Sequence, residues 1–452
     1  MFLTLADFLA HFPLIEISKD DFVKKFLVTY SGRPTLEDLF ALKSVIKTKD
    51  DQRYINRDKI VDYFYDVVVT NRHVYLTEFY KSYFELPPDF YGLKWDGVNI
   101  LTPATVDFDE PTFISTWVSY NENPEKNESS MLKEFNKLID QPLPGISLQK
   151  NDQSRKIIRN LNYLDILHNT QITNTCKSAT SFWQTLINVY NKLELEDRFF
   201  APSSIGLFLR EEKNAKTFFY LQQQYQPKAS ILNPYTVNWI LKNLFSGEKI
   251  LTPVLSWESY LLAFMHSDFN HYVGIDVMKG VCDRTQYLFD HYQTTLKPQL
   301  QSQKEIARLD RKHIDIYCQP SESLLYDRDF LDKYENYFDT ILLCPPYFNM
   351  EIYPTGEQSI DLYPSYDIWL TKYWEDTVAL CYLVLKPGKR FGFIINNYVS
   401  LKKKEYPLIQ DLNMITLKYF KLVGAYNLLN RVSPLRMNLK GRVENLFLYE
   451  KV

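Results

Sequence analysis

One stretch of the chain places an apolar run directly before two prolines and two aromatic residues. The run is Asp339–Leu343, and it continues into Cys344-Pro345-Pro346-Tyr347-Phe348. This pattern predicts a buried β-strand that stops at the prolines, because proline lacks the backbone N–H that a sheet requires. The backbone beyond the strand is then held rigidly, and its carbonyl oxygens can accept hydrogen bonds beside an aromatic ring.

The junction resembles that of the amino-methyltransferases that use S-adenosylmethionine, in which a strand ends in (Asp, Asn or Ser)-Pro-Pro-(Tyr or Phe). In that family the first residue and the first proline carbonyl accept hydrogen bonds from an exocyclic amine, and the ring stacks on the base. The resemblance implies that Cys344 and the Pro345 carbonyl hold the amine, that Pro346 completes the rigid turn, and that Tyr347 stacks. Positioning and electrostatics would supply the rate.

Cys344 departs from the family pattern. A thiol is a much weaker hydrogen-bond acceptor than a carboxylate, amide or hydroxyl. An aromatic amine needs acceptors on its protons, because its lone pair is delocalised into the ring. The sequence therefore does not decide whether this site turns over a substrate.

Residues 248–260 resemble the first cofactor motif of the same family, a strand followed by Asp-Pro-x-x-Gly-Trp-Gly. Pro253 and Trp257 match the motif, whereas Thr252 replaces the acid and Ser256 and Glu258 replace the glycines. Glycine at such positions lets a backbone approach a cofactor closely. The resemblance implies contacts with S-adenosylmethionine from Thr252, Pro253, Ser256 and Trp257, in a loop that has diverged or degraded.

Two other segments match the family in order and spacing. The run Tyr272–Ile275 ends in Asp276, whose carboxylate would accept the two ribose hydroxyls; a structural role as a turn cap is the alternative. Asn233-Pro234 lies where the family contacts the methionine part of the cofactor. Beyond Tyr347, an acid at Glu351, Gln358-Ser359 and the helix Tyr366–Trp374 resemble viral and phage-type members, although that helix can equally belong to the core.

Short apolar runs alternate with helical stretches from residue 199 onward, which predicts a mainly parallel sheet covered on both faces. We therefore expect an α/β fold: a Rossmann-like, doubly wound methyltransferase domain over residues 199–452, preceded by a mainly helical domain over residues 1–198. Ser18 with Asp21 is expected to begin a helix. Polar, breaker-rich residues predict loops over 119–130 and 141–154.

Composition excludes several classes of protein. The net charge of -3 argues against general coating of nucleic acid, although Lys402-Lys403-Lys404 and the tail residues Arg431, Arg436, Lys440 and Arg442 could contact phosphates. The 5 cysteines lie far apart in the sequence, so neither a metal site nor a disulfide framework is expected. No stretch of about 18 apolar residues and no basic leader precedes the fold, so we expect an intracellular protein (in the cytoplasm, a viral factory or a virion) with no membrane partner.

Three functions fit these residues. The first is methyl transfer to an exocyclic amine of adenine or cytosine in DNA or RNA, with the base flipped out of a duplex. The second is a catalytically inactive methyltransferase fold, a pseudoenzyme kept as a structural or assembly subunit of a viral complex or particle. The third is methylation of a protein or small-molecule amine. In each case residues 1–198 are free to dock a protein partner, to recognise a target or to act as a lid.

Overall fold

The described part of the chain divides into two compact units. The computed structural model describes residues 1–10, 16, 18–21, 65–86, 100–101, 110–140, 145–148, 154–163, 165–166, 171–172, 231–353, 356–399, 404–429 and 444–452. One unit comprises Met1, Asp89–Ile158 and Ser230–Val452, and the other comprises Phe2–Pro88 and Arg159–Ala229. This division does not coincide with a single boundary at residue 198, and the assignment of residues 1–198 to a domain of their own stays a prediction.

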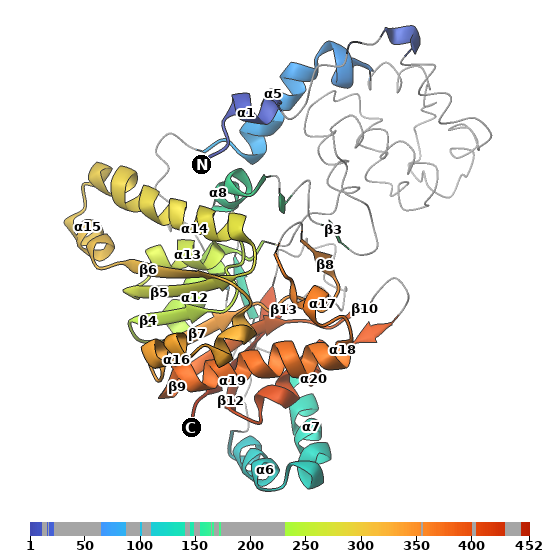
Figure 1. The fold of residues 1–452 in the computed structure, drawn as a ribbon, viewed down its shortest axis with the longest axis vertical. Coiled ribbons are helices and arrows are strands. Elements are labelled where there is room, and N and C mark those ends of the chain that lie inside the picture. Colours follow the sequence, from blue (N-terminus) through green and yellow to red (C-terminus); the bar gives the residue numbers. More distant parts are fainter. Residues whose placement is uncertain are drawn as a thin grey trace. The chain divides into compact units, whose positions relative to one another are not determined.

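The larger unit is built around one sheet, whose strand order is β1-β2-β12-β13-β9-β7-β4-β5-β6. Most strands of the described chain are labelled in Figure 1. They are β1 (Ile100–Leu101), β2 (Gly145–Leu148), β3 (Gln171–Ile172, in the smaller unit), β4 (Lys249–Thr252), β5 (His271–Asp276), β6 (His313–Cys318), β7 (Phe338–Leu343), β8 (Glu351–Ile352), β9 (Leu385–Ile395), β10 (Tyr398–Val399), β11 (Glu405–Tyr406), β12 (Lys421–Leu429) and β13 (Glu444–Glu450). The apolar runs predicted as strands from residue 199 onward correspond to β4, β5, β7, β9 and β13.

The five strands β6-β5-β4-β7-β9 are all parallel. Numbered along the chain they lie in the order 3-2-1-4-5, which is that of a doubly wound Rossmann-like sheet. β13 is antiparallel to both β9 and β12. The predicted α/β fold is confirmed, and its strand order reverses between β4 and β7.

The helices that pack on the sheet form two groups. One group contains α12, α13 and α14, and the other contains α16, α19 and α20 together with η6 and η7. The helices are α1 (Leu5–Ala10), α5 (Arg72–Tyr83), α6 (Glu110–Glu122), α7 (Pro124–Asp140), α8 (Ser154–Leu161), α12 (Pro234–Leu244), α13 (Ser259–Met265), α14 (Lys279–His291), α15 (Gln303–Asp310), α16 (Arg328–Tyr334), α17 (Ser359–Leu362), α18 (Tyr366–Ile368), α19 (Glu375–Val384) and α20 (Leu408–Thr416), with the shorter η1 (Asp66–Thr70), η4 (Tyr292–Leu296), η5 (Lys297–Gln299), η6 (Ser321–Tyr326) and η7 (Trp369–Trp374).

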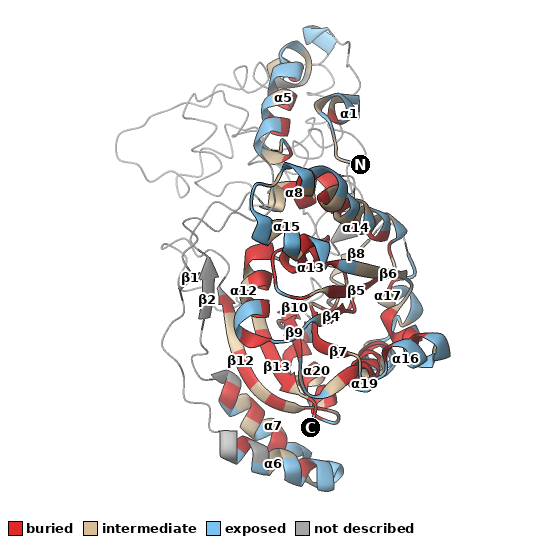
Figure 2. Cartoon of the chain, turned by 90° about the vertical axis from the view of Figure 1, so that its left-hand side faces the viewer, coloured by how far each residue is buried: buried red, intermediate tan, exposed pale blue. Residues whose placement is uncertain are grey.

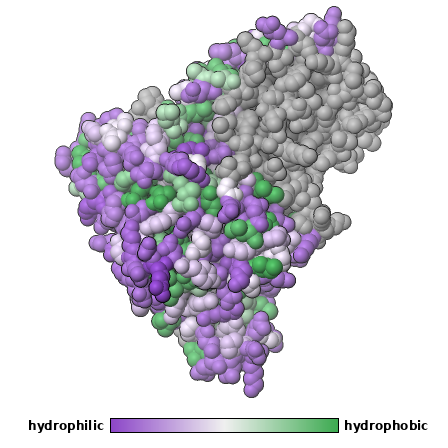
Figure 3. All heavy atoms as spheres, viewed as in Figure 1, coloured by the Kyte–Doolittle hydropathy of each residue, from purple (hydrophilic) through white to green (hydrophobic). Residues whose placement is uncertain are grey.

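Burial explains why the central parallel strands β5 and β7 are largely apolar. All six residues of β7 are buried, and only the last residue of β5 is not. Figure 2 shows buried residues along the sheet and on the helix sides that face it, with exposed residues outside. The outer face drawn in Figure 3 is mainly hydrophilic, with apolar residues interspersed. A sheet covered on both faces leaves only strand ends for polar chemistry.

The predicted loop over 119–130 is wrong. Residues 110–122 and 124–140 form the helices α6 and α7, which are separated at Asn123. Pro124 is the first residue of α7, where a helix needs no backbone N–H, so this proline begins a helix instead of ending one. The predicted loop over 141–154 also contains strand β2, which pairs in parallel with β12.

The described residues of the smaller unit are mostly helical, with the short strand β3 as the exception. Asn160 joins its segments, because its side chain accepts a hydrogen bond from Leu3 N at 2.7 Å and donates to the carbonyls of Leu3 and Phe84 at 3.0 Å. The predicted helix start at Ser18 is confirmed, since Ser18 Oγ accepts from Asp21 N at 3.1 Å. The rest of that helix lies outside the described residues.

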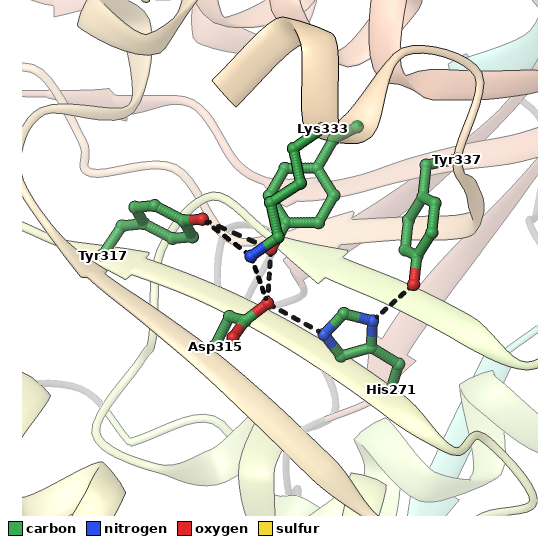
Figure 4. Close-up of polar contacts among 6 residues, drawn as sticks. His271, Asp315, Tyr317, Lys333 and Tyr337 are labelled. Atoms are coloured by element: carbon green, nitrogen blue, oxygen red, sulfur yellow. Dashed lines mark hydrogen bonds and ion pairs between the residues drawn. The ribbon is translucent and has the colours of Figure 1, made fainter. Parts of the chain in front are cut away.

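A polar network ties β5, β6 and α16 together at the amino-terminal ends of the strands (Figure 4). Asp315 Oδ2 accepts hydrogen bonds from Lys333 Nζ at 3.0 Å, from His271 Nε2 at 3.2 Å and from the Tyr334 hydroxyl. His271 Nδ1 lies 2.8 Å from the Tyr337 hydroxyl. These donors keep the pKa of Asp315 below its ordinary value although burial opposes them. Burial lowers the pKa of His271 to about 4.

We predict that Asp315→Asn lowers the free energy of unfolding by about 1 kcal/mol at pH 7, since the carboxylate is one-third exposed and solvent weakens its bonds. The depressed pKa means that this stabilisation is present above the ordinary carboxyl pKa and is lost as the pH falls through the folded value. Urea unfolding of both proteins measures it. The exposed Asp332→Asn on the same helix should change nothing; equal effects of the two changes would contradict the role of the network.

Candidate functional site

The candidate site lies at the carboxyl ends of β4 and β7, where the strand order reverses. Neighbouring crossover connections leave the sheet in opposite directions there, so ligands of open α/β sheets bind at this edge. β4 ends at Thr252 and β7 at Leu343. The Cys344–Tyr347 turn and the 253–258 turn therefore begin on adjacent strands.

The residues after β7 are fixed from one side by aromatic packing. Pro345 is buried, Cys344 and Pro346 are partly buried, and Phe348 is 4% exposed. The Phe348 ring lies 5.8 Å from that of Trp369, which is fully buried. Trp369 and Trp374 thus belong to the core, which is the alternative stated above for the helix Tyr366–Trp374.

Tyr347 is partly buried beside β10. Its ring centroid lies 5.9 Å from that of Tyr398, at an interplanar angle of 68°. The Tyr398 hydroxyl donates to Asn349 Oδ1 at 2.6 Å, which fixes the turn that follows Tyr347. Burial, followed by Cys344 and Glu444, raises the pKa of the Tyr347 hydroxyl, so Tyr347 is a neutral aromatic ring at pH 7.

Cys344 lies among acids and tyrosines. Burial, then the carboxylates of Glu444 and Glu351, raise the pKa of its thiol well above the ordinary value, so the thiol is protonated at pH 7. Glu444 reaches this edge because β13 is antiparallel and begins where β9 ends: Asn445 pairs with Ile395. Glu351 Oε2 accepts a hydrogen bond from the Tyr353 hydroxyl at 2.5 Å.

Two buried tyrosines have Cys344 among their electrostatic neighbours. Tyr260 on α13 is fully buried, and burial and then Cys344 raise its pKa. Tyr373 on η7 is 3% exposed, and its neighbours include Glu322, Cys344 and Asp276. The Tyr373 hydroxyl has no hydrogen-bond partner within the described part of the chain. A buried hydroxyl without a partner costs about 1–3 kcal/mol, so a ligand that bonds to it would recover this energy.

The turn after β4 is left-handed although it contains no glycine. Ser256, Trp257 and Glu258 have φ values of 49°, 53° and 57°. Such residues cost roughly 1–2 kcal/mol each when they carry a Cβ. Trp257 is 6% exposed and packs edge-on against Tyr353, with ring centroids 5.6 Å apart. The backbone conformation that glycine favours is thus present without glycine.

Thr252 and Pro253 are both buried. The Thr252 hydroxyl donates to the Tyr272 hydroxyl at 2.6 Å, so this side chain bonds to β5. At the end of β5, Asp276 is partly buried and accepts from Met278 N at 3.0 Å and from Leu255 N at 3.3 Å. Burial raises the pKa of Asp276 to about 6, although these N–H groups lower it. The carboxylate therefore joins the ends of β4 and β5.

Asn233 and Pro234 begin helix α12. Asn233 Oδ1 accepts from Tyr235 N at 2.9 Å, and Pro234 occupies the first turn. Ser259 Oγ donates to the Leu232 carbonyl at 2.7 Å, which holds this segment against the start of α13. The segment consequently lies next to the turn at Ser256–Glu258.

A short loop after β8 lies over the end of β5. Gln358 closes it, since Oε1 accepts from Tyr353 N at 2.9 Å and Nε2 donates to the Tyr353 carbonyl at 2.7 Å. Gly356 has φ 91°, and a Cβ there would lie 2.5 Å from the Val277 carbonyl oxygen. Glycine is therefore required where the loop meets Val277.

Comparisons with known proteins give only distant structural similarity. No protein-family model and no curated protein matches the chain. Similar solved structures include an S-adenosylmethionine-dependent O-methyltransferase from Thermotoga maritima (10% identity, 50% of this chain and 68% of that one, TM-score 0.28), TrmN from Thermus thermophilus (14%, 49% and 49%, 0.30) and the N-methyltransferase NodS from Bradyrhizobium japonicum (11%, 48% and 85%, 0.27). The match to TrmN spans about half of each chain. At these values no substrate can be transferred to this chain.

The structure brings the predicted residues to one edge of the sheet, and adds residues that the sequence did not reveal. Tyr353, Tyr373 and Glu444 reach the site through tertiary contacts that no local pattern encodes. Glu351 and the Gly356–Gln358 segment were visible as a polar loop. Among the described residues there is no group of three or more side chains suited to a metal ion, and no helix is long and apolar enough to cross a membrane.

We predict that Ser256→Gly raises the free energy of unfolding by about 1 kcal/mol, because glycine relieves the left-handed strain at this position. Thermal and urea unfolding give the change. Ser365→Gly is the matched control, since Ser365 is exposed with φ -94° and gains no relief. A loss of stability in both variants would show that the turn is not strained.

Proposed function

We propose that the chain is a methyltransferase that uses S-adenosylmethionine and methylates an exocyclic amine of a nucleic-acid base, adenine or cytosine. The observation that supports this most is the joint position of two motifs. The Pro-Pro-Tyr turn follows β7 and the Asp276 carboxylate follows β5, on either side of β4, at the edge where this sheet type binds ligands.

The residues at this edge fit S-adenosylmethionine. Asp276 has a carboxylate that can accept hydrogen bonds from two ribose hydroxyls, and the Tyr373 hydroxyl lacks a partner among the described residues. Pro253, Ser256 and Trp257 would line the cofactor, with Asn233-Pro234 at its methionine end. Thr252 would support the cofactor site indirectly, because its hydroxyl donates a hydrogen bond to the Tyr272 hydroxyl on β5. When bound, the cofactor supplies an electrophilic methyl group on a sulfonium.

Glu351 and Glu444 compensate for the weak acceptor at Cys344. The Pro345 carbonyl accepts a hydrogen bond from one amine N–H, and a carboxylate beside the thiol accepts a hydrogen bond from the other. As the amine nitrogen forms its new bond to carbon it must lose a proton, and a carboxylate at the end of this turn can receive it. Tyr347 holds the base by stacking.

A nucleic-acid substrate also needs cations for its phosphates. The predicted contacts Arg431, Arg436, Lys440, Arg442 and most of the 402–404 run lie outside the described residues, and Lys404 is exposed beside Tyr406. Docking of a protein partner by residues 1–198, an intracellular or viral location, and methylation of a protein or small-molecule amine stay predictions.

The alternative is an inactive methyltransferase fold with a structural or assembly role in a viral complex or particle. Its supporting observation is the packing of Trp257 against Tyr353, since Tyr353 has Asp276 among its neighbours. If this packing is permanent, the cofactor cannot reach the carboxylate. Cofactor binding separates the two functions.

We expect S-adenosylmethionine to bind the full chain and to raise its melting temperature, because a ligand selective for the native state stabilises it. Asp276→Asn should weaken binding at pH 7.5 by about tenfold or more, as charged hydrogen bonds to the ribose are lost. Isothermal calorimetry measures the binding to each protein, and thermal unfolding measures the melting temperature. Asp283→Asn, an exposed change on α14, is the control. No binding to the unmodified chain at millimolar ligand would favour the structural role.

The same carboxyl predicts opposite pH trends for binding and for stability. Because its folded pKa of about 6 lies above the ordinary 3.8, ionised Asp276 costs stability, and this cost disappears as the pH falls from about 6 to 4. Binding should weaken over the same range as the acceptor is protonated. Calorimetry and melting at stepped pH would reveal both, and Asp276→Asn should remove the two trends.

Turnover should respond in opposite directions to two changes in the Pro-Pro-Tyr turn. Tyr347→Ala should lower methyl transfer to DNA or RNA by about 10- to 100-fold through lost stacking, and Cys344→Asp should raise it by supplying a strong acceptor. Transfer of a labelled methyl group is the measurement, with the exposed Tyr326→Ala as control. Unchanged turnover in Tyr347→Ala would show that the base does not stack there.

A further inference from the structure

Two cysteines that are far apart in the sequence meet beside Asp276. Cys282 lies in the first turns of α14, and Cys318 is the last residue of β6, where it pairs with Asp276 in the parallel register. Cys282 Sγ lies 3.6 Å from the Asp276 carbonyl oxygen and 4.0 Å from that of Tyr317. Cys282 Sγ therefore lies beside the end of β6, and Cys318 is among the neighbours that raise the pKa of its thiol.

The two thiols differ in access to solvent. Cys318 is exposed, whereas Cys282 is 5% exposed. Burial, followed by Asp276 and Cys318, raises the pKa of Cys282. A dissolved oxidant therefore meets Cys318 first, and the resting pair is reduced.

We propose that Cys282 and Cys318 form an oxidation site that reacts with peroxide and closes to a disulfide. In the first step the Cys318 sulfur attacks a peroxide oxygen; the O–O bond breaks, one water leaves and a sulfenic acid forms. In the second step the Cys282 sulfur attacks the Cys318 sulfur, the S–O bond breaks and a second water leaves. The two thiols lose two electrons and the peroxide gains them, so no further reactant is needed.

The disulfide would act on Asp276 directly. Cys282 gives up its contact with the Asp276 carbonyl, and the first turn of α14 is drawn toward the end of β6. That turn follows Met278, whose N–H orients the Asp276 carboxylate at 3.0 Å. The predicted loss of cofactor affinity rests on the proposed function, whereas formation of the disulfide does not.

The test uses the full chain, treated with one equivalent of hydrogen peroxide and then with a thiol-blocking reagent. We expect mass spectrometry to find peptides of Cys282 and Cys318 joined with loss of two hydrogens. Closing this loop should raise the melting temperature by about 5–10 °C, and dithiothreitol should reverse the change. S-adenosylmethionine should bind the oxidised chain about fivefold more weakly or worse.

Variants identify the pair. Cys282→Ser and Cys318→Ser should each abolish the linked peptide and the melting shift, whereas Cys381→Ala, in the core away from the pair, should retain both. Stable sulfinic acid at Cys318, or a disulfide between chains, without a Cys282–Cys318 link would overturn the proposal.

A linked peptide with unchanged melting temperature and cofactor binding would overturn the inference that the disulfide affects the Asp276 site. If the reduced chain fails to bind the cofactor, the proposed function fails, while the linked peptide and the melting shift still decide the oxidation site.

Discussion

Burial of the central parallel strands β4, β5 and β7 is the constraint on which the rest of this structure depends. All residues of β7 are buried, and Asp276 at the carboxyl end of β5 is only partly buried. The backbone polar groups of these inner strands bond to neighbouring strands, so a side chain that is to meet a ligand must lie at or beyond a strand end. The reversal of strand order between β4 and β7 then selects one place along that edge. The positions of Cys344, Asp276 and the Ser256–Glu258 turn all follow from this geometry.

The sequence was sufficient for those parts of the fold that depend on local patterns. β4, β5, β7, β9 and β13 each contain a short apolar run, and the alternation of these runs with helices predicts the doubly wound sheet. β6 and β12 went unrecognised, because β6 has no buried residue and β12 contains Gly424 and Asn427. The helices α6 and α7 were missed for a related reason: exposed polar residues and a proline at a helix start look like a loop when burial is unknown.

A residue of the candidate site was predictable where it lies at the carboxyl end of its own strand. It was not predictable where tertiary packing brings it to the site from a distant part of the sequence. Asp276 and the Pro-Pro-Tyr turn were found because each immediately follows a strand. Glu444 arrives because β13 runs backwards, Tyr373 because η7 packs under the β7 turn, and Cys318 because β6 is the neighbour of β5. These positions depend on strand order and helix packing, which are long-range properties that no single window of sequence contains.

The turn after β4 has a consequence for how such a site changes over time. Its three left-handed residues keep the path of the backbone although the glycines that normally favour it are absent. Losing the glycines and losing the turn are therefore separate events. A chain that carries serine and glutamate at these positions gives up some stability but keeps the shape of the turn, whereas glycine at the buried position of Glu258 would leave an empty space. The absence of glycine is thus a weak guide to whether a turn of this shape has been lost.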